Sequence, residues 1–390
     1  MQRRTLWLLT ILFFMMGFIT CLNDILVPFL KSVFNLDYAQ AALVQLCFFG
    51  AYGLTSIPAS ELIERIGYQK GIVLGFLTTA LGCFLFYPAV GLHSYPIFLG
   101  ALFILAMGVV MLQVAGNPLV ALMGDQATSS SRLTMTQAFN SLGTFLAPMF
   151  GSWLILSRME ISGHESVRYP YLGIGVLLIA IALLLARVKF PPIERKAKGP
   201  WGHLLKNRNL LLGMVGIFTY VGAEVAIGTF LVNYIMAAMS IPEVEAANLV
   251  SLYWGAAMVG RFIGIFTLKM FKPGSVLACH ALLATALVVI SMQTTGQVSV
   301  YALILVGLCN SIMFPTIFTL GIRDLASSER ASGLLATAII GGAFIPYFMG
   351  LMADSIGLKI AMILPAVCYL YILGYGLSCR KLTIKVAAEA

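Results

Sequence analysis

The stretch LWLLTILFFMMGFITCLNDILVPFL, residues Leu6–Leu30, decides the fold class of this chain. About 20 mostly apolar residues are enough for a helix to cross the hydrocarbon core of a membrane. A second such run, LLGMVGIFTYVGAEVAIGTFLVNYIMAAM, covers Leu211–Met239. Each run contains a single carboxylate, Asp24 in the first and Glu224 in the second. An ionised acid at the centre of a membrane helix costs about 2.5–3.5 kcal/mol, so the two acids indicate passage of an ion or a polar solute.

The composition of the whole chain agrees with lipid as its solvent. Hydrophobic residues make up 60% of the 390 residues and charged residues 10%, whereas soluble domains are about 45–50% apolar and about 25% charged. The length rule for membrane helices predicts twelve spans. They lie near residues 5–30, 39–60, 70–90, 95–122, 134–157, 169–188, 209–238, 246–270, 275–293, 298–321, 332–353 and 358–379.

The longest polar stretch divides these spans into two sets of six. It covers residues 189–208 and combines a Pro-Pro pair with a cluster of cations, as a linker does. The sequence therefore predicts an all-α polytopic membrane protein with twelve transmembrane helices in two six-helix halves. The N-terminal bundle is expected at 1–188, a cytoplasmic linker at 189–208 and the C-terminal bundle at 209–390.

The distribution of Lys and Arg predicts the orientation, because these residues concentrate on the cytoplasmic side of membrane proteins. With a cytoplasmic N-terminus, all of the 24 cations except Lys31, Arg158, Arg168 and Lys359 fall inside. We therefore expect both termini in the cytoplasm. The net charge of +9 reflects this topology and attraction to anionic lipid. We expect no nucleic-acid partner, because no basic segment carries interleaved aromatic residues.

The two halves repeat one another in sequence. RLTMTQAFNSLGTFLAP at 132–148 and RASGLLATAIIGGAFIP at 330–346 both begin with Arg and carry Gly and Pro at matching places. A parallel duplication about an axis along the membrane normal is one of the repeat types of transporter folds. The sequence therefore predicts two halves of the same architecture.

The two acids occupy related places in this repeat. Asp24 lies seven residues after Gly17, and Glu224 lies eight after Gly216, so we expect near-equivalent depths. Desolvation favours the neutral form of an acid, so Asp24 is predicted to bind and release a cation during coupling. Glu224 is predicted to be a second proton site, or half of a Na⁺ site together with backbone carbonyls.

Neutral amides and aromatic rings are the other polar features of the spans. The candidate substrate-binding residues are Asn23, Gln45, Gln113, Asn117, Gln137, Asn140, Tyr220, Asn310 and Phe314. Amides donate and accept hydrogen bonds, as sugar hydroxyls do, so this set favours a neutral polyol. Amides also join membrane helices to one another, and that purely structural role stays open for each of them.

Charged residues near the span ends form a separate set of predicted conformational latches. These are Glu64, Arg65, Lys70, Arg132, Arg261 and Arg330. The seven cysteines lie in or at the ends of spans without metal-ligand spacing, and we interpret them as small core residues. We expect no metal centre and no cofactor.

The motifs together resemble a known transporter family. ERIGYQKG, from Glu64, looks like a degenerate form of the major facilitator loop between the second and third spans. Six longer motifs resemble the fucose–galactose–glucose:proton symporter family, and more closely its bacterial glucose/galactose branch. They are CLNDILVPFLK (21–31), LQVAGNPLVALMG (112–124), RLTMTQAFNSLGT (132–144), YVGAEVAIGTFL (220–231), NSIMFPTIFTLGI (310–322) and IIGGAFIP (339–346).

The resemblance implies a rocker-type sugar–cation symporter of the bacterial inner membrane with the major facilitator fold. Asp24 matches the family's first-span carboxylate, which links protonation to sugar binding. Gln113 departs from the fucose–proton symporter pattern, which has a second essential Glu there, whereas Glu224 falls where that pattern has an amide. Positions around the family's central cavity are matched by Asn23, Gln45, Asn117, Gln137 and Asn140.

We therefore expect a monomer in membrane lipid that imports a neutral monosaccharide, glucose or galactose first, together with H⁺. The sequence leaves open Na⁺ coupling near Glu224, a different sugar (fucose, an amino sugar or a modified sugar), and export in place of import. A membrane-embedded enzyme or a sensor is disfavoured, because the four histidines are scattered and the chain shows no appended soluble domain.

Overall fold

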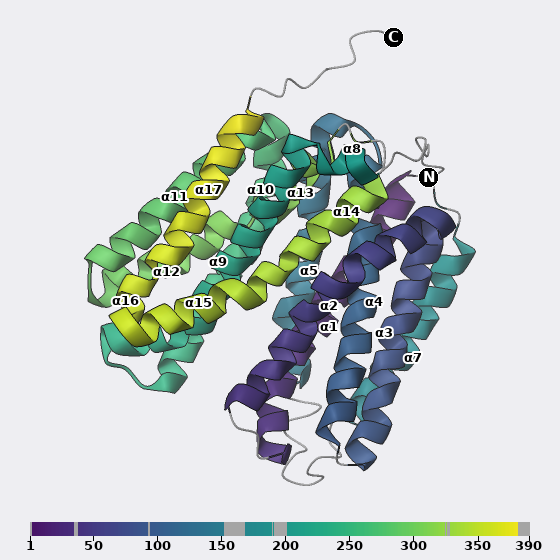
Figure 1. Cartoon of the computed structure of the whole chain (residues 1–390), viewed down its shortest axis with the longest axis horizontal. Coiled ribbons are helices and arrows are strands. Elements are labelled where there is room, and N and C mark those ends of the chain that lie inside the picture. The colour runs from purple at the N-terminus through teal and green to yellow at the C-terminus, as the bar shows by residue number, and fades with distance from the viewer. Residues whose placement is uncertain are drawn as a thin grey trace. The chain divides into compact units, whose positions relative to one another are not determined.

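The computed structural model describes residues 2–34, 38–92, 94–151, 168–188, 190, 201–323, 325 and 328–380. Side chains are described throughout these ranges except at residues 2–5, 23–34, 38–42, 148, 151, 243 and 244. Over this part of the chain every regular element is a helix (Figure 1). The first half contains α1 (Gln2–Phe34), α2 (Tyr38–Ile66), α3 (Tyr68–Gly91), α4 (Tyr95–Leu122), the 3-10 turn η1 (Gln126–Thr128), α5 (Ser129–Gly151) and α7 (Arg168–Arg187).

The second half continues the same pattern of long helices. Three of its helical regions are interrupted: α12 is followed by α13, α14 by η4 and α15, and α16 by α17. The elements are α8 (Trp201–Leu205), α9 (Arg208–Met239), α10 (Glu243–Met270), α11 (Pro273–Gln293), α12 (Gly296–Asn310), α13 (Met313–Gly321), α14 (Ser328–Thr337), η4 (Ala338–Ile340), α15 (Gly341–Ile356), α16 (Leu358–Ala361) and α17 (Ile363–Cys379).

These helices correspond to the predicted spans. Ten helical regions among the described residues are long and apolar enough to cross a membrane, and α1 has a shorter apolar stretch at Leu6–Leu22. The remaining long helix, α5, begins SSSRLTMTQAFNS, so its polar side chains lower its hydropathy. Polar groups in a membrane helix face the protein interior or a wet cavity. The low hydropathy of α5 is therefore consistent with a span whose neighbours are mostly protein.

Two compact units divide the structure, and they differ from the predicted bundles at two segments. Unit 1 contains Met1–Val120, Phe139–Arg195 and Ser327–Thr337. Unit 2 contains Ala121–Ala138, Lys196–Ala326 and Ala338–Ala390. The first part of α5 thus packs with the C-terminal helices, and α14 packs with the N-terminal ones. The predicted linker at 189–208 falls largely outside the described residues.

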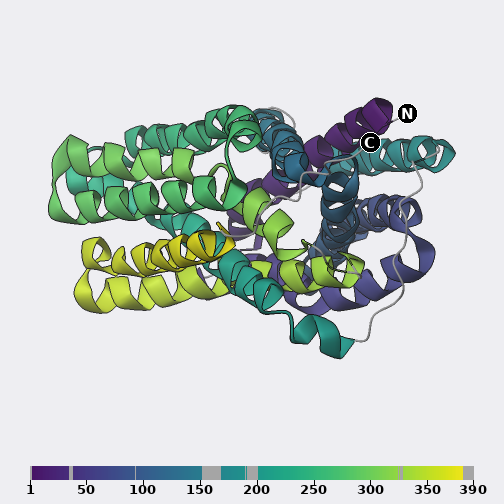
Figure 2. The same ribbon diagram turned by 90° about the horizontal axis from the view of Figure 1, so that it is seen from above.

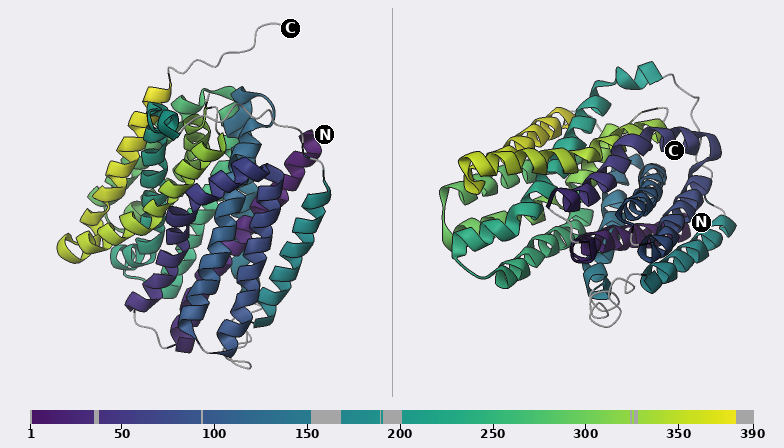
Figure 3. Two further views of the ribbon diagram at one scale, coloured as in Figure 1. Left: turned by 45° about the vertical axis from the view of Figure 1, so that its right-hand side comes forward. Right: turned by 60° about the horizontal axis from the view of Figure 1, so that its bottom comes forward.

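In unit 1, α3 lies along α7, and α14 lies along α2 (Figures 1 and 3). At Gly82 the backbone of α3 approaches α4 so closely that an added Cβ would lie 2.5 Å from the Leu105 nitrogen. Gln69, at the start of α3, caps the end of α7. Its Nε2 donates hydrogen bonds to the carbonyl oxygens of Leu185 (2.9 Å) and Val188 (2.6 Å). Carbonyls at a helix C-terminus lack intrahelical partners, so this contact satisfies two of them.

In unit 2, α9 is the central helix and contacts α10, α12, α13, α15 and α17, while α11 packs on α12 and α17 (Figure 2). A buried hydroxyl cluster fixes one end of this arrangement. The Tyr234 hydroxyl lies 2.6 Å from Ser291 Oγ and 2.5 Å from Ser299 Oγ, which joins α9 to the turn between α11 and α12. Buried hydroxyls need such partners, because an unpaired one is costly in an apolar medium.

The break between α12 and α13 has a covalent cause. Pro315 lacks an N–H, and its ring crowds the carbonyl four residues earlier, which is that of Ser311. The helix accordingly ends at Asn310 and restarts at Met313. The same argument applies inside α4, where Pro118 frees the carbonyl of Val114. Both freed carbonyls are used by side chains from other helices.

Candidate functional site

The carboxyl group of Glu224 lies on α9 in unit 2 with unsatisfied hydrogen-bonding capacity. Its Oε1 atom is buried and has no hydrogen-bond partner. The Tyr220 hydroxyl, one helical turn earlier, is also buried and without a partner. The two groups lie close enough to interact, although not with hydrogen-bond geometry. Orphaned buried polar atoms cost free energy, so this pair indicates a place where a proton or a ligand binds.

A chain of hydrogen bonds connects Glu224 to the broken span. The Tyr253 hydroxyl donates to the Glu224 carbonyl oxygen (3.3 Å), and Asn310 Nδ2 donates to the Tyr253 hydroxyl oxygen (2.8 Å). The Tyr369 hydroxyl donates to Asn310 Oδ1 (2.8 Å). Asn310 is fully buried. In this structure its amide holds α10, α12 and α17 together, and the predicted contact with a substrate would require one of these bonds to break.

Arg261 and an aromatic cluster complete the surroundings in unit 2. Arg261 Nε donates to the Ser311 carbonyl that Pro315 frees, and its Nη1 donates to the Gln137 carbonyl, both at 3.4 Å. The predicted site residues Tyr220 and Phe314 come together, with ring centroids 6.5 Å apart. A partly exposed ring such as Phe314 offers an apolar face on which a ligand can stack.

In unit 1, two predicted amides on α4 leave acceptors unpaired. Gln113 Nε2 donates to the Tyr52 hydroxyl (3.0 Å), but Gln113 Oε1 has no partner. Asn117 Oδ1, one turn later, is buried and also has none. Two amide oxygens on one helix face therefore require donors that the described residues do not supply. Gln45, on α2, is exposed, and the side chains of Asn23 and Asp24 lie outside the described residues.

The two predicted amides of α5 contribute to different units. Asn140 Nδ2 donates to the Phe13 carbonyl (3.0 Å), which ties α5 to α1 in unit 1. The Gln137 side chain is 7% exposed, and its backbone carbonyl accepts the bond from Arg261 in unit 2. Asn140 thus has a helix-joining contact of the kind that membrane amides often make. Its predicted substrate contact stays a prediction.

The helix crossings within each unit relate the two acids to the repeat differently from the predicted glycine spacing. A Cβ at Gly143 of α5 would overlap the Phe14 carbonyl oxygen of α1, and one at Gly341 of α15 would overlap the Phe218 carbonyl oxygen of α9. These crossings make Phe14 the counterpart of Phe218. Asp24 follows Phe14 by ten residues, whereas Glu224 follows Phe218 by six. The difference is about one turn of α-helix, or about 6 Å of rise, so Glu224 sits nearer the start of its helix than Asp24 does.

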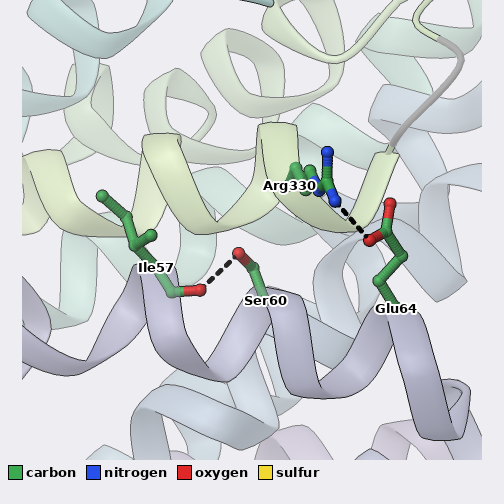
Figure 4. A network of polar contacts seen from close by, with 4 residues as sticks. All are labelled: Ile57, Ser60, Glu64 and Arg330. Atoms are coloured by element: carbon green, nitrogen blue, oxygen red, sulfur yellow. Dashed lines mark hydrogen bonds and ion pairs between the residues drawn. The ribbon is translucent and has the colours of Figure 1, made fainter. Parts of the chain in front are cut away.

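The predicted latches behave differently from one another. Arg330 Nη2 of α14 forms an ion pair with Glu64 Oε2 of α2 at 2.9 Å (Figure 4). Beside it, a Cβ at Gly333 would lie 2.5 Å from Ser60 Cβ, so the two helices meet closely. Two residues after Arg330, Ser332 Oγ donates to the Val114 carbonyl freed by Pro118 (3.0 Å). Glu64 and Arg330 are therefore ion-paired, and their role as a conformational latch stays a prediction.

The contacts of Arg132 are of a different kind. Arg132 donates to the backbone carbonyls of Asp125 (2.6 Å) and Ala121 (2.9 Å), at the end of α4. It thus braces the α4–α5 connection. Arg65 and Lys70 are exposed. An exposed cation next to a membrane end interacts with anionic lipid headgroups, and a latch role for these two residues stays a prediction.

Replacing Arg330 with Gln is expected to weaken the contact between α14 and α2. Hydrogen bonds to charged groups contribute about 1.5–3 kcal/mol, and side-chain exposures of 16% for Arg330 and 10% for Glu64 limit screening. The melting temperature of the purified protein should fall, and the exchanged pair Glu64→Arg with Arg330→Glu should recover most of the loss. Arg65→Gln, at an exposed cation, is the matched control and should change little. Equal melting temperatures for Arg330→Gln and the parent would contradict the latch.

Several residues of these networks are absent from the sequence-based set. Tyr253 and Tyr369 could be found by asking which intramembrane hydroxyls need a partner, since buried tyrosine hydroxyls usually have one. Ser332 could be found from Pro118, because a proline inside a helix frees the carbonyl four residues earlier. Which side chain reaches that carbonyl depends on the packing of helices distant in sequence.

Comparisons with known proteins agree with this architecture. A model of the Major Facilitator Superfamily matches residues 6–339. A protein of Brucella abortus described as a glucose/galactose transporter is 47% identical, over 95% of this chain and 92% of its own length. The L-fucose-proton symporter of Escherichia coli is 34% identical, over 93% of this chain and 90% of its own. A crystal structure of the E. coli fucose:proton symporter superposes with a TM-score of 0.89 at 32% identity, covering 98% of this chain and all of that one.

Proposed function

The chain belongs to the Major Facilitator Superfamily, and we propose that it is a secondary active symporter that imports a neutral hexose, glucose or galactose, together with a proton. The observation that carries the proposal is the pair of buried amide oxygens on α4, Gln113 Oε1 and Asn117 Oδ1, which have no donor in the part of the chain that the structure describes. Adjacent hydroxyls of a sugar ring are donors that can satisfy both. The 47% identity to a glucose/galactose transporter supports the choice of sugar.

The chemistry of the site suits a neutral ligand. In unit 1 the described polar partner of Gln113 is the Tyr52 hydroxyl. In unit 2 Phe314 lies beside Tyr220, which interacts with the Glu224 carboxyl and with Arg261. An anionic substrate would be repelled by the ionised form of Glu224. Within unit 1, sugar hydroxyls supply donors for the orphaned acceptors of α4. Within unit 2, Phe314 offers a ring on which the apolar face of a sugar can stack. Substrate contacts of Gln45 in unit 1 and of Gln137 and Tyr220 in unit 2 are part of the proposal.

Two acids are available to carry the coupling cation. Asp24 and Glu224 both lie within helices expected to be surrounded by lipid or protein, where the protonated form of a carboxyl is favoured. A proton needs a single acceptor oxygen, and Glu224 Oε1 is one. The proton symport stated for the E. coli relative supports the proton as the coupling ion. We place the protein in the bacterial inner membrane as a monomer with both termini cytoplasmic, following the distribution of Lys and Arg.

Transport into proteoliposomes tests the proposal. Labelled galactose or glucose should accumulate when the outside is made acidic relative to the lumen, and an imposed sodium gradient without a pH gradient should drive nothing. An excess of unlabelled galactose should compete, and a charged sugar phosphate should not. Accumulation driven by sodium alone would replace the proton with Na⁺ in this mechanism. Failure of both gradients to drive any hexose would overturn the proposed function.

A further inference from the structure

The arrangement around α10 raises the question of what connects the Glu224 carboxyl to the rest of unit 2. Arg261 is the cation whose charge acts on this carboxyl. It is bound at the same time to two backbone carbonyls, one at the broken span and one in the first part of α5. A guanidinium is always charged. Arg261 therefore connects the Glu224 carboxyl to the break between α12 and α13 and to the first part of α5, which packs with unit 2.

The directions of the side chains explain how Arg261 comes close to the Glu224 carboxyl. Arg261 follows Tyr253 by two turns of α10, and Tyr253 reaches the Glu224 backbone. Long side chains on a helix point back toward its N-terminus. On α10 this direction leads from Arg261 toward Tyr253, and on α9 it leads from Glu224 toward Tyr220. Because α9 and α10 are joined by a short connection at residues 240–242 and run antiparallel, these two directions converge.

The other titratable groups near Glu224 cannot replace Arg261. Those that act on it are hydroxyls, which are neutral at ordinary pH. Neither α13 nor η4 brings a titratable residue, and the groups of α15 and α8 are exposed. The described groups that interact with Glu224 or with these tyrosines are Tyr220 on α9, Tyr253 and Arg261 on α10, Tyr369 on α17 and, next to Tyr253, Cys309 on α12. The groups on α15 and α8, Tyr347, Asp354 and His203, are exposed.

We propose that Arg261 changes its hydrogen-bond acceptors when Glu224 gains or loses its proton. This change controls how firmly the first part of α5 is attached to the rest of unit 2. With Glu224 protonated, Arg261 donates to the carbonyls of Ser311 and Gln137, as in this structure. When Glu224 loses its proton, the carboxylate is the stronger acceptor, because its negative charge attracts the guanidinium and a neutral backbone carbonyl has no such charge. The guanidinium then turns to Glu224 and leaves the Gln137 carbonyl.

Loss of the Arg261 bond has a specific structural consequence. The first part of α5 is also held by Ser131, whose Oγ donates to the Ile265 carbonyl of α10 (2.7 Å), and by the Ser130–Thr319 hydroxyl pair at 2.6 Å. These bonds are neutral and do not respond to the charge of Glu224. The attachment should therefore weaken on deprotonation without disappearing, as a step in a reversible transport cycle requires. Arg261 is a positioning residue in this scheme and need not touch the sugar.

This inference rests on the proposed role of Glu224 in proton coupling, but its test needs no transport. Thr134 of α5 is fully buried, its hydroxyl bonds only to its own helix, and its methyl lies 3.5 Å from the position of a Cβ on Gly264 of α10. Thr134→Cys therefore reports detachment of α5 and leaves the bonds between the helices intact. The reporter is made in full-length protein in which the seven native cysteines are replaced by serine. Lys206→Cys, at an exposed residue, corrects for the ionisation of the thiol itself.

The reporter is labelled with a maleimide at about pH 5.5 and about pH 8.5, on either side of the range in which a desolvated carboxyl titrates. Relative to the Lys206 reference, labelling should rise by about tenfold at the higher pH, the factor that corresponds to loss of one charge-assisted hydrogen bond. Glu224→Gln should give slow labelling at both pH values, because the amide carries no charge. Arg261→Gln should give fast labelling at both, and Arg261→Lys should restore part of the pH dependence.

Each alternative outcome bears on the proposal. If Glu224→Gln keeps the full pH dependence, the titrating group is not Glu224 and the proposal fails. If Arg261→Gln labels as slowly as Glu224→Gln, Arg261 does not hold α5 and the proposal fails as well. The double variant should match Arg261→Gln, because Glu224 acts through Arg261. A protein that shows this labelling pattern without moving any hexose would retain the partner exchange and lose the proposed substrate.

Discussion

Replacing Gly341 with alanine is expected to prevent α15 from packing on α9. The added methyl carbon would overlap the Phe218 carbonyl oxygen and would lie 2.8 Å from the carbon of the same carbonyl. A backbone group cannot rotate away as a side chain does, so relief requires the two helices to separate. Overpacking of a core typically costs about 1–3 kcal/mol, and we expect at least the upper end here. The yield of monodisperse protein in detergent and its melting temperature should both fall steeply.

Gly255 provides the matched control for this substitution. It lies in α10 of the same unit, and a Cβ added there would meet nothing within 4 Å. Gly255→Ala should therefore be neutral or slightly stabilising, since alanine is favoured over glycine in a helix by up to about 1 kcal/mol. Gly143→Ala should be as damaging as Gly341→Ala, because it overlaps the Phe14 carbonyl in the corresponding crossing. A Gly341 variant as stable as the Gly255 variant would contradict the close crossing.

The sequence repeat predicted these two glycines, and the reason is geometric. Both follow an arginine by eleven residues and precede a proline by five, so the whole α5 and α14–α15 regions are matched position by position. The helices that they cross, α1 and α9, contain no such shared spacing of Arg, Gly and Pro. The helix α9 contains glycines at 213, 216, 222 and 228, and the sequence does not say which of them faces α15. Choosing Gly216 placed Glu224 one turn away from its true relation to Asp24.

The packing of α14 on α2 shows a second limit of what can be predicted from the sequence. The residues of the Arg330–Glu64 pair were both assigned to latches, but their partnership joins positions more than 260 residues apart. The chemistry of each residue type restricts its possible partners to opposite charges or carbonyls. The pairing itself depends on α14 lying along α2, which no local pattern encodes. For the same reason Arg132 could be expected at a latch, although in the structure it braces carbonyls at the end of α4.

The amides illustrate how residue type and role separate. The sequence assigned Asn310 and Asn117 to one polar class, since both precede a proline in corresponding spans. In the structure Asn310 uses both ends of its amide on tyrosines, whereas the Asn117 oxygen is buried without a donor. A satisfied amide stabilises the helix bundle, and an unsatisfied acceptor favours ligand binding. The distinction depends on where Tyr253 and Tyr369 lie, which follows only from the packed structure.

Asp24→Asn is expected to abolish accumulation of sugar against its gradient and to leave exchange of sugar across the membrane. The amide cannot bind and release a proton, so sugar movement loses its connection to the proton gradient. One proton moving through about 100 mV supplies about 2.3 kcal/mol, which sustains about 50-fold accumulation. The variant should stop at equal concentrations inside and outside. Uptake of labelled galactose into proteoliposomes under an imposed proton gradient, and counterflow in the same vesicles, measure the two activities separately.

Glu224→Gln and Asp354→Asn separate coupling from a general effect of removing an acid. Asp354 is exposed at the end of α15, and its variant should accumulate sugar as the parent does. Glu224→Gln should keep part of the accumulation with an altered pH dependence, because its carboxyl acts on the attachment of α5 through Arg261. Full accumulation by Asp24→Asn would move the coupling proton to another group. Glu224 would then be the strongest candidate, since Gln113 occupies the α4 position at which the fucose–proton symporter pattern carries its second acid, and a glutamine does not titrate.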